Sequence, residues 1–138
     1  SVVVANRREA RAEALAMGFQ ITFRRARLTP AGLDAEALEG LARSADLVVN
    51  TTSIGMMGRG SVGFPVHMLK KKAIVADIVY RPLETAFLKR AKKLGLRTHN
   101  GLSMLVAQGA LTFKLWTGRD APEDAMRKAA LKALREAK

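Results

Sequence analysis

The sequence predicts an α/β fold in which a parallel sheet is covered by helices on both faces. Short apolar runs alternate along the chain with longer segments of helical periodicity. Three of these runs, Val2–Ala5, Asp46–Asn50 and Ala73–Val79, carry their apolar residues at consecutive rather than alternate positions. Continuous apolar runs of this length are typical of strands buried on both faces, so the expected sheet is doubly wound.

The first half of the chain is expected to alternate strands and helices from its first residues. In order, the pattern predicts a strand at Val2–Ala5, a helix at Arg8–Met17, a strand at Phe19–Phe23, a helix ending at Arg43 and a strand at Asp46–Asn50. Gly18 is expected to end the first helix as a C-cap. Asp34 is expected to begin the second helix, because its side chain can accept a hydrogen bond from the first turn.

The second half is expected to continue the alternation after a glycine-containing loop. The pattern predicts this loop at Thr51–Phe64, a strand at Ala73–Val79, a helix at Leu83–Leu94, a strand at Leu96–His99, a helix at Gly101–Thr117 and a last helix from Pro122 to Lys138. Residues 102–138 therefore form an expected helical C-terminal segment. A chain of 138 residues is long enough for one domain.

Charge and composition narrow the class of partner. The chain has 24 lysines and arginines against 12 acidic residues, so its formal net charge is +12 and an anionic partner is expected. Nucleic acid is the less favoured choice, because single-strand binding relies on aromatic stacking and aromatic residues make up only 5% of the chain. Cysteine is absent and there are two histidines, so no metal site is expected. No apolar span or signal pattern is present, and we expect no membrane and a cytoplasmic location.

Positive charge is concentrated directly after the first predicted strand, at Asn6, Arg7, Arg8 and Arg11. Phosphates bind to α/β sheets at the carboxyl ends of strands, near helix N-termini. A guanidinium group pairs with two phosphate oxygens at once, and arginine near the ribose accommodates the 2′-phosphate of NADP. If the helix begins near Arg8, Arg7 and Arg11 can converge on one anion. The cluster predicts an NADP-type site in a Rossmann-like fold, with solvated helix charges as the alternative interpretation.

Further stretches resemble shikimate dehydrogenase. They are NTTSIGM at 50–56, DIVYRPLET at 77–85, NGLSMLVAQGA at 100–110 and LWTG at 115–118, in that family's order and spacing. The segment from Asn6 to Arg11 is similar to the family's Asn-Arg-Thr-x-x-Arg motif for NADP, with Arg8 standing where threonine is usual. The resemblance implies that Arg7 lies against the adenine and, with Asn6 and Arg11, holds the 2′-phosphate. Arg8 is expected to add positive charge there.

The resemblance also implies cofactor contacts in the second half of the chain. Thr52 and Ser53 would border the adenine ribose, although residues of these types also end strands through local hydrogen bonds. Ile78, Gly101 and Met104 would lie at the nicotinamide. By residue type alone, Ile78 is equally typical of a core, and a methionine at helical spacing, such as Met104, is more often a core residue. Gly101 would allow close approach of the backbone, a role compatible with capping a helix.

Substrate contacts are implied for Tyr80 and Gln108. Both polar side chains adjoin apolar segments, where an unpaired polar group is costly, and a surface glutamine is the alternative for Gln108. The implied substrates are shikimate and 3-dehydroshikimate. The family's catalytic lysine and aspartate belong to an N-terminal substrate domain, so no catalytic residue is expected in this chain.

The expected fold lacks one element. In a dinucleotide-binding sheet, a first strand and its glycine-rich turn precede the strand that ends at the ribose. The Gly-x-Gly-x-x-Gly at residues 58–63 lies within the predicted loop at Thr51–Phe64 and does not join a strand directly to a helix, and Val2–Ala5 and Asp46–Asn50 would each lack a neighbour. We therefore expect residues 1–138 to be an incomplete C-terminal NADP-binding domain, inactive alone, whose partner is the missing N-terminal part or another copy of the chain. The alternatives are a basic Rossmann-like nucleic-acid-binding module and a quinate/shikimate dehydrogenase with another cofactor preference.

Overall fold

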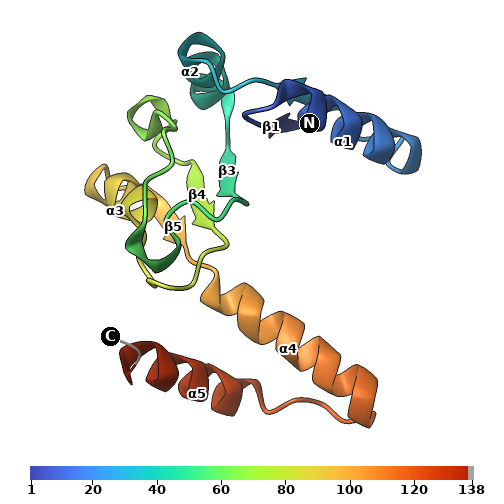
Figure 1. Ribbon diagram of the computed structural model, residues 1–138, viewed down its shortest axis with the longest axis vertical. Coiled ribbons are helices and arrows are strands. Elements are labelled where there is room, and N and C mark those ends of the chain that lie inside the picture. The colour runs from blue at the N-terminus through green and yellow to red at the C-terminus, as the bar shows by residue number, and fades with distance from the viewer. Residues whose placement is uncertain (137–138) are drawn as a thin grey trace. The chain divides into compact units, whose positions relative to one another are not determined.

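The strands of this protein pair in parallel in two separate sheets (Figure 1). The computed structural model describes residues 1–136 and divides into two units, Ser1–Ser44 and Ala45–Lys138. The first unit contains β1 (Val2–Ala5), α1 (Glu9–Thr22), β2 (Leu28–Ala31) and α2 (Ala35–Ser44). The second contains β3 (Leu47–Asn50), β4 (Ile74–Asp77), α3 (Ala86–Lys93), β5 (Arg97–His99), α4 (Leu102–Thr117) and α5 (Glu123–Glu136). The expected helix end at Lys138 lies outside the described residues.

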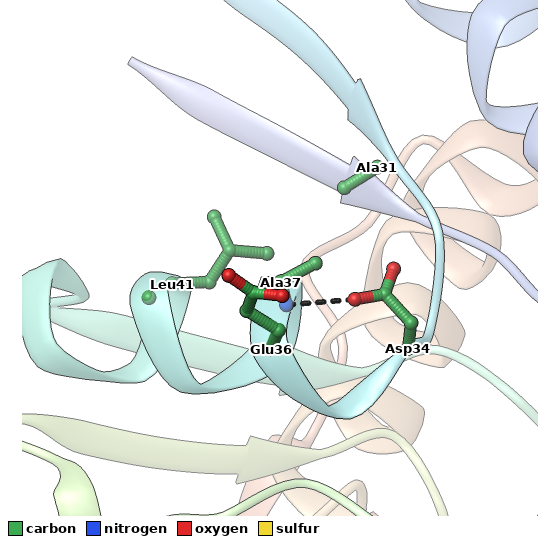
Figure 2. Close-up of a pocket in the computed structure, with 6 residues that line it drawn as sticks. Ala31, Asp34, Glu36, Ala37 and Leu41 are labelled. Carbon is green, nitrogen blue, oxygen red and sulfur yellow. Dashed lines mark hydrogen bonds between the residues drawn. The ribbon is translucent and has the colours of Figure 1, made fainter.

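In the first unit, α1 packs against both β1 and β2. Its buried positions are Ala12 and Ala16, whose small side chains let the helix lie close to the sheet. The predicted N-cap of the second helix is confirmed, because Asp34 Oδ1 accepts a hydrogen bond of 2.8 Å from the backbone N–H of Ala37 (Figure 2). The cap fixes the point at which the chain turns from β2 into α2.

The prediction of a strand at Phe19–Phe23 is wrong, because α1 continues to Thr22 and Gly18 lies inside it. The alternation of Phe19, Gln20 and Ile21 mimics a strand period. In the structure, Gln20 bonds instead to the turn that follows: its Nε2 donates to Ala26 O at 2.8 Å, and its Oε1 accepts from Leu28 N at 3.1 Å. The second strand therefore forms later, at Leu28–Ala31.

β2 contains a proline, at Pro30. The carbonyls of Arg27 and Ala31 accept hydrogen bonds from the backbone N–H groups of Val2 and Asn6. Every second residue from Arg27 to Ala31 therefore directs its backbone N–H and C=O toward β1. Pro30 lies between these residues, so its backbone nitrogen, which carries no hydrogen, is on the side away from β1. The ladder between β1 and β2 thus loses no donor to the proline.

In the second unit, β4 is the central strand, between β3 and β5. One core cluster fills the space between this sheet and α3; its buried members are Val66, Val75, Phe87, Leu88, Ala91 and Leu96. Thr85 begins α3 as its N-cap, accepting from Leu88 N at 3.3 Å. The helices α4 and α5 contact each other. The core thus packs this sheet against α3.

Both outer strands of each sheet have an open edge among the described residues, β1 and β2 in the first sheet and β3 and β5 in the second. β1 pairs only with β2, and β3 pairs only with β4, among the described residues. Burial on both faces was expected for β1 and β3, but Val2 is 52% exposed and Leu47 is 57% exposed. The predicted parallel α/β fold is confirmed, and the strand expected between β1 and β3 is absent from residues 1–136.

Exposed apolar side chains also occur on α4, where Leu115 and Trp116 are 84% and 85% exposed. No helix within the described part of the chain is long and apolar enough to cross a membrane.

Candidate cofactor site at the carboxyl ends of the strands

The arginine cluster follows β1 at the N-terminus of α1. Asn6 Oδ1 accepts a hydrogen bond of 2.9 Å from Arg8 N, and Arg8 is the N-cap residue of the helix. Arg7, Arg8 and Arg11 are exposed and make no ion pair with another residue among positions 1–136. Three unpaired guanidinium groups beside a helix N-terminus are a suitable site for a phosphate group.

The helix begins at Glu9, one residue later than the start near Arg8 from which Arg7 and Arg11 were expected to converge on one anion. Arg7 therefore precedes the N-cap, and the spacing of four residues does not place Arg7 and Arg11 on one helix face. Both still flank the first turn of α1. Their convergence on one anion stays a prediction that depends on their side-chain conformations.

Two carboxylates, those of Asp34 and Glu9, lie near the end of β2. A Cβ atom on Gly32 would be 3.3 Å from Asp34 Oδ2 and 3.7 Å from Glu9 Oε2. A pocket here is lined by Ala31, Asp34, Glu36, Ala37, Gly40 and Leu41, most of which are labelled in Figure 2. Because Asp34 caps α2, the position of its carboxylate is explained by the fold without a ligand.

In the second unit, the loop after β3 is held by the buried side chain of Asn50. Asn50 Oδ1 accepts hydrogen bonds from the backbone N–H and the hydroxyl of Thr52, at 3.0 and 2.7 Å. Asn50 Nδ2 donates to Ile54 O at 3.1 Å. Thr52 and Ser53 are exposed at the start of this loop. Both can therefore be reached by a ligand without rearrangement of the loop.

The turn after β4 carries Ile78, Val79 and Tyr80. Ile78 is half-buried and Tyr80 is exposed, while Val79 is buried. Asp77, at the end of β4, accepts a hydrogen bond of 3.0 Å from Val79 N and is itself 2% exposed. The turn is thus fixed by a buried side chain and by a hydrogen bond of 3.1 Å from Ile78 N to Asn50 O, and it exposes the side chain of Tyr80.

Gly101 joins β5 to α4 and lies directly against the turn after β4. Its N–H donates to Val79 O at 3.2 Å, and a Cβ atom at this position would be 1.9 Å from Ile78 O. Gly101 is therefore required by a close contact within the protein's own backbone, and the approach of its backbone to the carboxamide of a nicotinamide stays a prediction. Met104 and Gln108 lie farther along α4, and both are exposed rather than part of the core.

Each unit thus has chemically active residues at the carboxyl ends of its parallel strands, the edge at which open α/β sheets bind ligands. Cationic side chains gather in the first unit, and hydroxyl, amide and phenol groups in the second. This arrangement is typical of the class of nucleotide-binding α/β proteins.

Comparisons with known proteins narrow the class further. A family model for the shikimate 5'-dehydrogenase C-terminal domain matches residues 101–131. The shikimate dehydrogenase (NADP(+)) of Geobacter metallireducens is 38% identical over 135 residues, and that of Methanosarcina acetivorans is 42% identical over 134 residues. Each alignment covers nearly the whole chain, 98% and 96%, and 47% of the relative. The chain spans about half the length of the curated relatives it matches.

Solved structures give the same result. Shikimate 5-dehydrogenase from Thermus thermophilus, in complex with NADP(H) and shikimate, matches with a TM-score of 0.77 and 40% identity over 96% of this chain and 46% of that one. Quinate dehydrogenase from Corynebacterium glutamicum, in complex with NAD, matches with a TM-score of 0.83 and 36% identity over 94% of this chain and 45% of that one. These matches confirm the resemblance of the chain to the C-terminal part of shikimate dehydrogenases.

Proposed function

We propose that this chain is the NADP-binding part of a shikimate dehydrogenase. The complete enzyme reduces 3-dehydroshikimate to shikimate: NADPH supplies a hydride to the carbonyl carbon and a proton goes to the carbonyl oxygen. Residues of the described chain bind and orient the cofactor and contact the substrate. The proton is handled by residues of the N-terminal domain, consistent with the sequence interpretation that none of the catalytic acids lies here.

The observation that carries this proposal is the match between the family's motifs and the strand ends. Every residue assigned by resemblance to cofactor or substrate follows a strand or lies in the first two turns of the helix after it. In the first unit, Arg7 and Arg11, with Asn6 and Arg8, are proposed to hold the 2′-phosphate of NADP. Their unpaired guanidinium groups suit a phosphate dianion.

In the second unit, Thr52 and Ser53 are proposed to contact the adenine ribose, and Ile78, Gly101 and Met104 the nicotinamide. The fit is favourable at Gly101, where the absence of a side chain keeps the backbone of Ile78 close to the helix start. Tyr80 and Gln108, both exposed, are proposed to contact the substrate.

The proposed partners include a strand between β1 and β3. The open edges of these strands would be closed by the N-terminal part of the same enzyme or by another copy of the chain. Residues 1–138 are then one C-terminal cofactor domain with a helical segment from residue 102. The cytoplasmic location predicted from the sequence belongs to the same proposal.

The test is calorimetric titration of the full-length protein with NADP⁺ and NAD⁺. We expect tighter binding of NADP⁺, and we expect the double variant Arg7→Ala/Arg11→Ala to lose about 10- to 100-fold in NADP⁺ affinity. The loss for NAD⁺ should be smaller, because NAD⁺ loses only the contact of Arg7 with the adenine. A matched control is Arg24→Ala/Arg25→Ala, which removes the same charge from exposed positions beyond α1. Equal losses in both double variants would show that only net charge matters and would contradict the assigned site.

A quinate dehydrogenase is the second candidate, because the Corynebacterium glutamicum enzyme is in complex with NAD and matches with a TM-score of 0.83. Oxidation of shikimate and of quinate, each with NADP⁺ and NAD⁺, separates the two functions. Our proposal requires the highest kcat/KM with shikimate and NADP⁺. A preference for quinate and NAD⁺ would replace it.

A further inference from the structure

A buried network of three polar side chains connects the strand ends of the second unit. Asn50 Nδ2 donates to Asp77 Oδ1 at 3.0 Å, and Thr85 Oγ1 donates to Asp77 Oδ2 at 2.7 Å. Asn50, Asp77 and Thr85 are 5%, 2% and 1% exposed. They come from the end of β3, the end of β4 and the start of α3. The network therefore lies beneath the surface formed by the loops described above.

Every bond at Asp77 comes from a different segment. Oδ1 accepts from Asn50 Nδ2 and from Val79 N, and Oδ2 accepts from Thr85 Oγ1. No lysine or arginine pairs with Asp77 among residues 1–136. Its two oxygens are satisfied by neutral donors in fixed positions, so the carboxylate acts as a junction of defined geometry and not as half of an ion pair.

The junction joins the two loops to which opposite ends of the cofactor are assigned. On one side, Asn50 holds the backbone and hydroxyl of Thr52. On the other side, Asp77 holds Val79 N, and the carbonyl of Val79 accepts from Gly101 N. A continuous chain of hydrogen bonds therefore runs across the carboxyl ends of β3 and β4 to the start of α4.

We propose that Asn50, Asp77 and Thr85 are positioning residues for the dinucleotide. They fix the distance between the loop at Thr52 and the turn at Ile78, and so match the site to a ligand that spans both. The inference rests on the proposed function. It predicts that breaking the network weakens binding of the whole dinucleotide more than binding of its adenosine half, because the half-ligand does not reach the Ile78 turn.

The main test variant is Thr85→Val, which keeps the shape of the side chain and removes the hydroxyl that bonds to Asp77. Thr85→Ser restores the hydroxyl and is the matched variant. Because Thr85 also caps α3, a second variant, Asn50→Asp, keeps the acceptor for Thr52 and replaces with an oxygen the amide nitrogen that donates to Asp77 and to Ile54 O. The full-length protein is titrated by calorimetry with NADP⁺ and with 2′,5′-ADP, which lacks the nicotinamide half.

We expect Thr85→Val to raise the Kd for NADP⁺ about tenfold and that for 2′,5′-ADP less than about threefold, with Thr85→Ser close to the wild type. Asn50→Asp should also weaken NADP⁺ more than 2′,5′-ADP. A purely structural role would lower the fraction of protein that binds, seen as the stoichiometry, and leave the Kd unchanged. Unchanged constants, or equal losses for both ligands, overturn the positioning role.

The wild-type titration separates this inference from the function on which it rests. If the wild type binds neither NADP⁺ nor 2′,5′-ADP, the proposed function fails and the positioning role fails with it. If the wild type binds both and the variants lose affinity for both equally, only the positioning role fails.

Discussion

Replacing Gly101 with alanine tests the contact between the start of α4 and the turn after β4. The new Cβ atom would lie 1.9 Å from Ile78 O and 2.4 Å from Ile78 C. Since real Cβ contacts are essentially never shorter than 3.0 Å, the two backbone segments must separate by about 1 Å. The backbone dihedrals of Gly101, φ −71° and ψ −6°, are accessible to alanine. Any loss of stability on substitution is therefore due to the close contact and not to backbone strain.

The expected cost follows from two contributions. Overpacking in a rigid region costs about 1–3 kcal/mol, and loss of the hydrogen bond from Gly101 N to Val79 O costs about 1 kcal/mol. We therefore expect Gly101→Ala to lower the free energy of unfolding by about 2–4 kcal/mol. The measurement is urea denaturation of the full-length protein followed by circular dichroism.

Gly109→Ala is the matched control, in the same helix. Its Cβ atom would meet only Met126 Cε, at an ordinary 3.5 Å. Alanine is favoured over glycine in a helix interior, so this variant should be stabilised by about 0.5–1 kcal/mol. If Gly101→Ala unfolds within about 0.5 kcal/mol of the wild type, the contact with Ile78 does not constrain the site and the reasoning is refuted.

Two further substitutions test other parts of the structure. Gly55 has φ +97°, and a Cβ atom there would also lie 3.3 Å from Thr85 Cγ2, so Gly55→Ala should destabilise the protein by about 1–3 kcal/mol; a urea midpoint equal to that of the wild type would contradict this. Asp34→Ala should cost about 1 kcal/mol because α2 loses its cap, whereas Asp34→Asn should retain most of that stability. The same urea experiment measures both Asp34 variants, and equal midpoints for them would show that capping is not responsible.

The element order could be predicted from the sequence because most signals there are local. Asp34 caps its helix as expected, and the apolar run within Ala73–Val79 forms the central strand β4. The misassigned strand at Phe19–Phe23 failed for a physical reason. Gln20 satisfies backbone groups of the turn at Ala26 and the strand at Leu28, and such pairings between separated residues leave no periodic trace in the sequence.

In the candidate site, too, local motifs could be predicted from the sequence and contacts between distant residues could not. The motifs located Thr52, Ile78 and Gly101, because the resemblance covers the loops in which these residues lie. The network of Asn50, Asp77 and Thr85 could not be predicted from periodicity, since it joins residues 27 and 8 positions apart through a buried carboxylate. An aspartate at the end of an apolar strand was the available signal, because a buried carboxylate requires donors from its neighbours.

The proline in β2 determines at which edge a further strand can pair with the sheet of the first unit. The outer edge of β2 lacks the N–H of Pro30. A strand that approached this edge would therefore lose one of the backbone donors it needs for pairing. The edge of β1 has no such interruption along Val2–Ala5. Strand addition to this sheet, whether productive assembly or edge-to-edge aggregation, is therefore directed to β1, and a proline at Val3 would be the simplest way to block it.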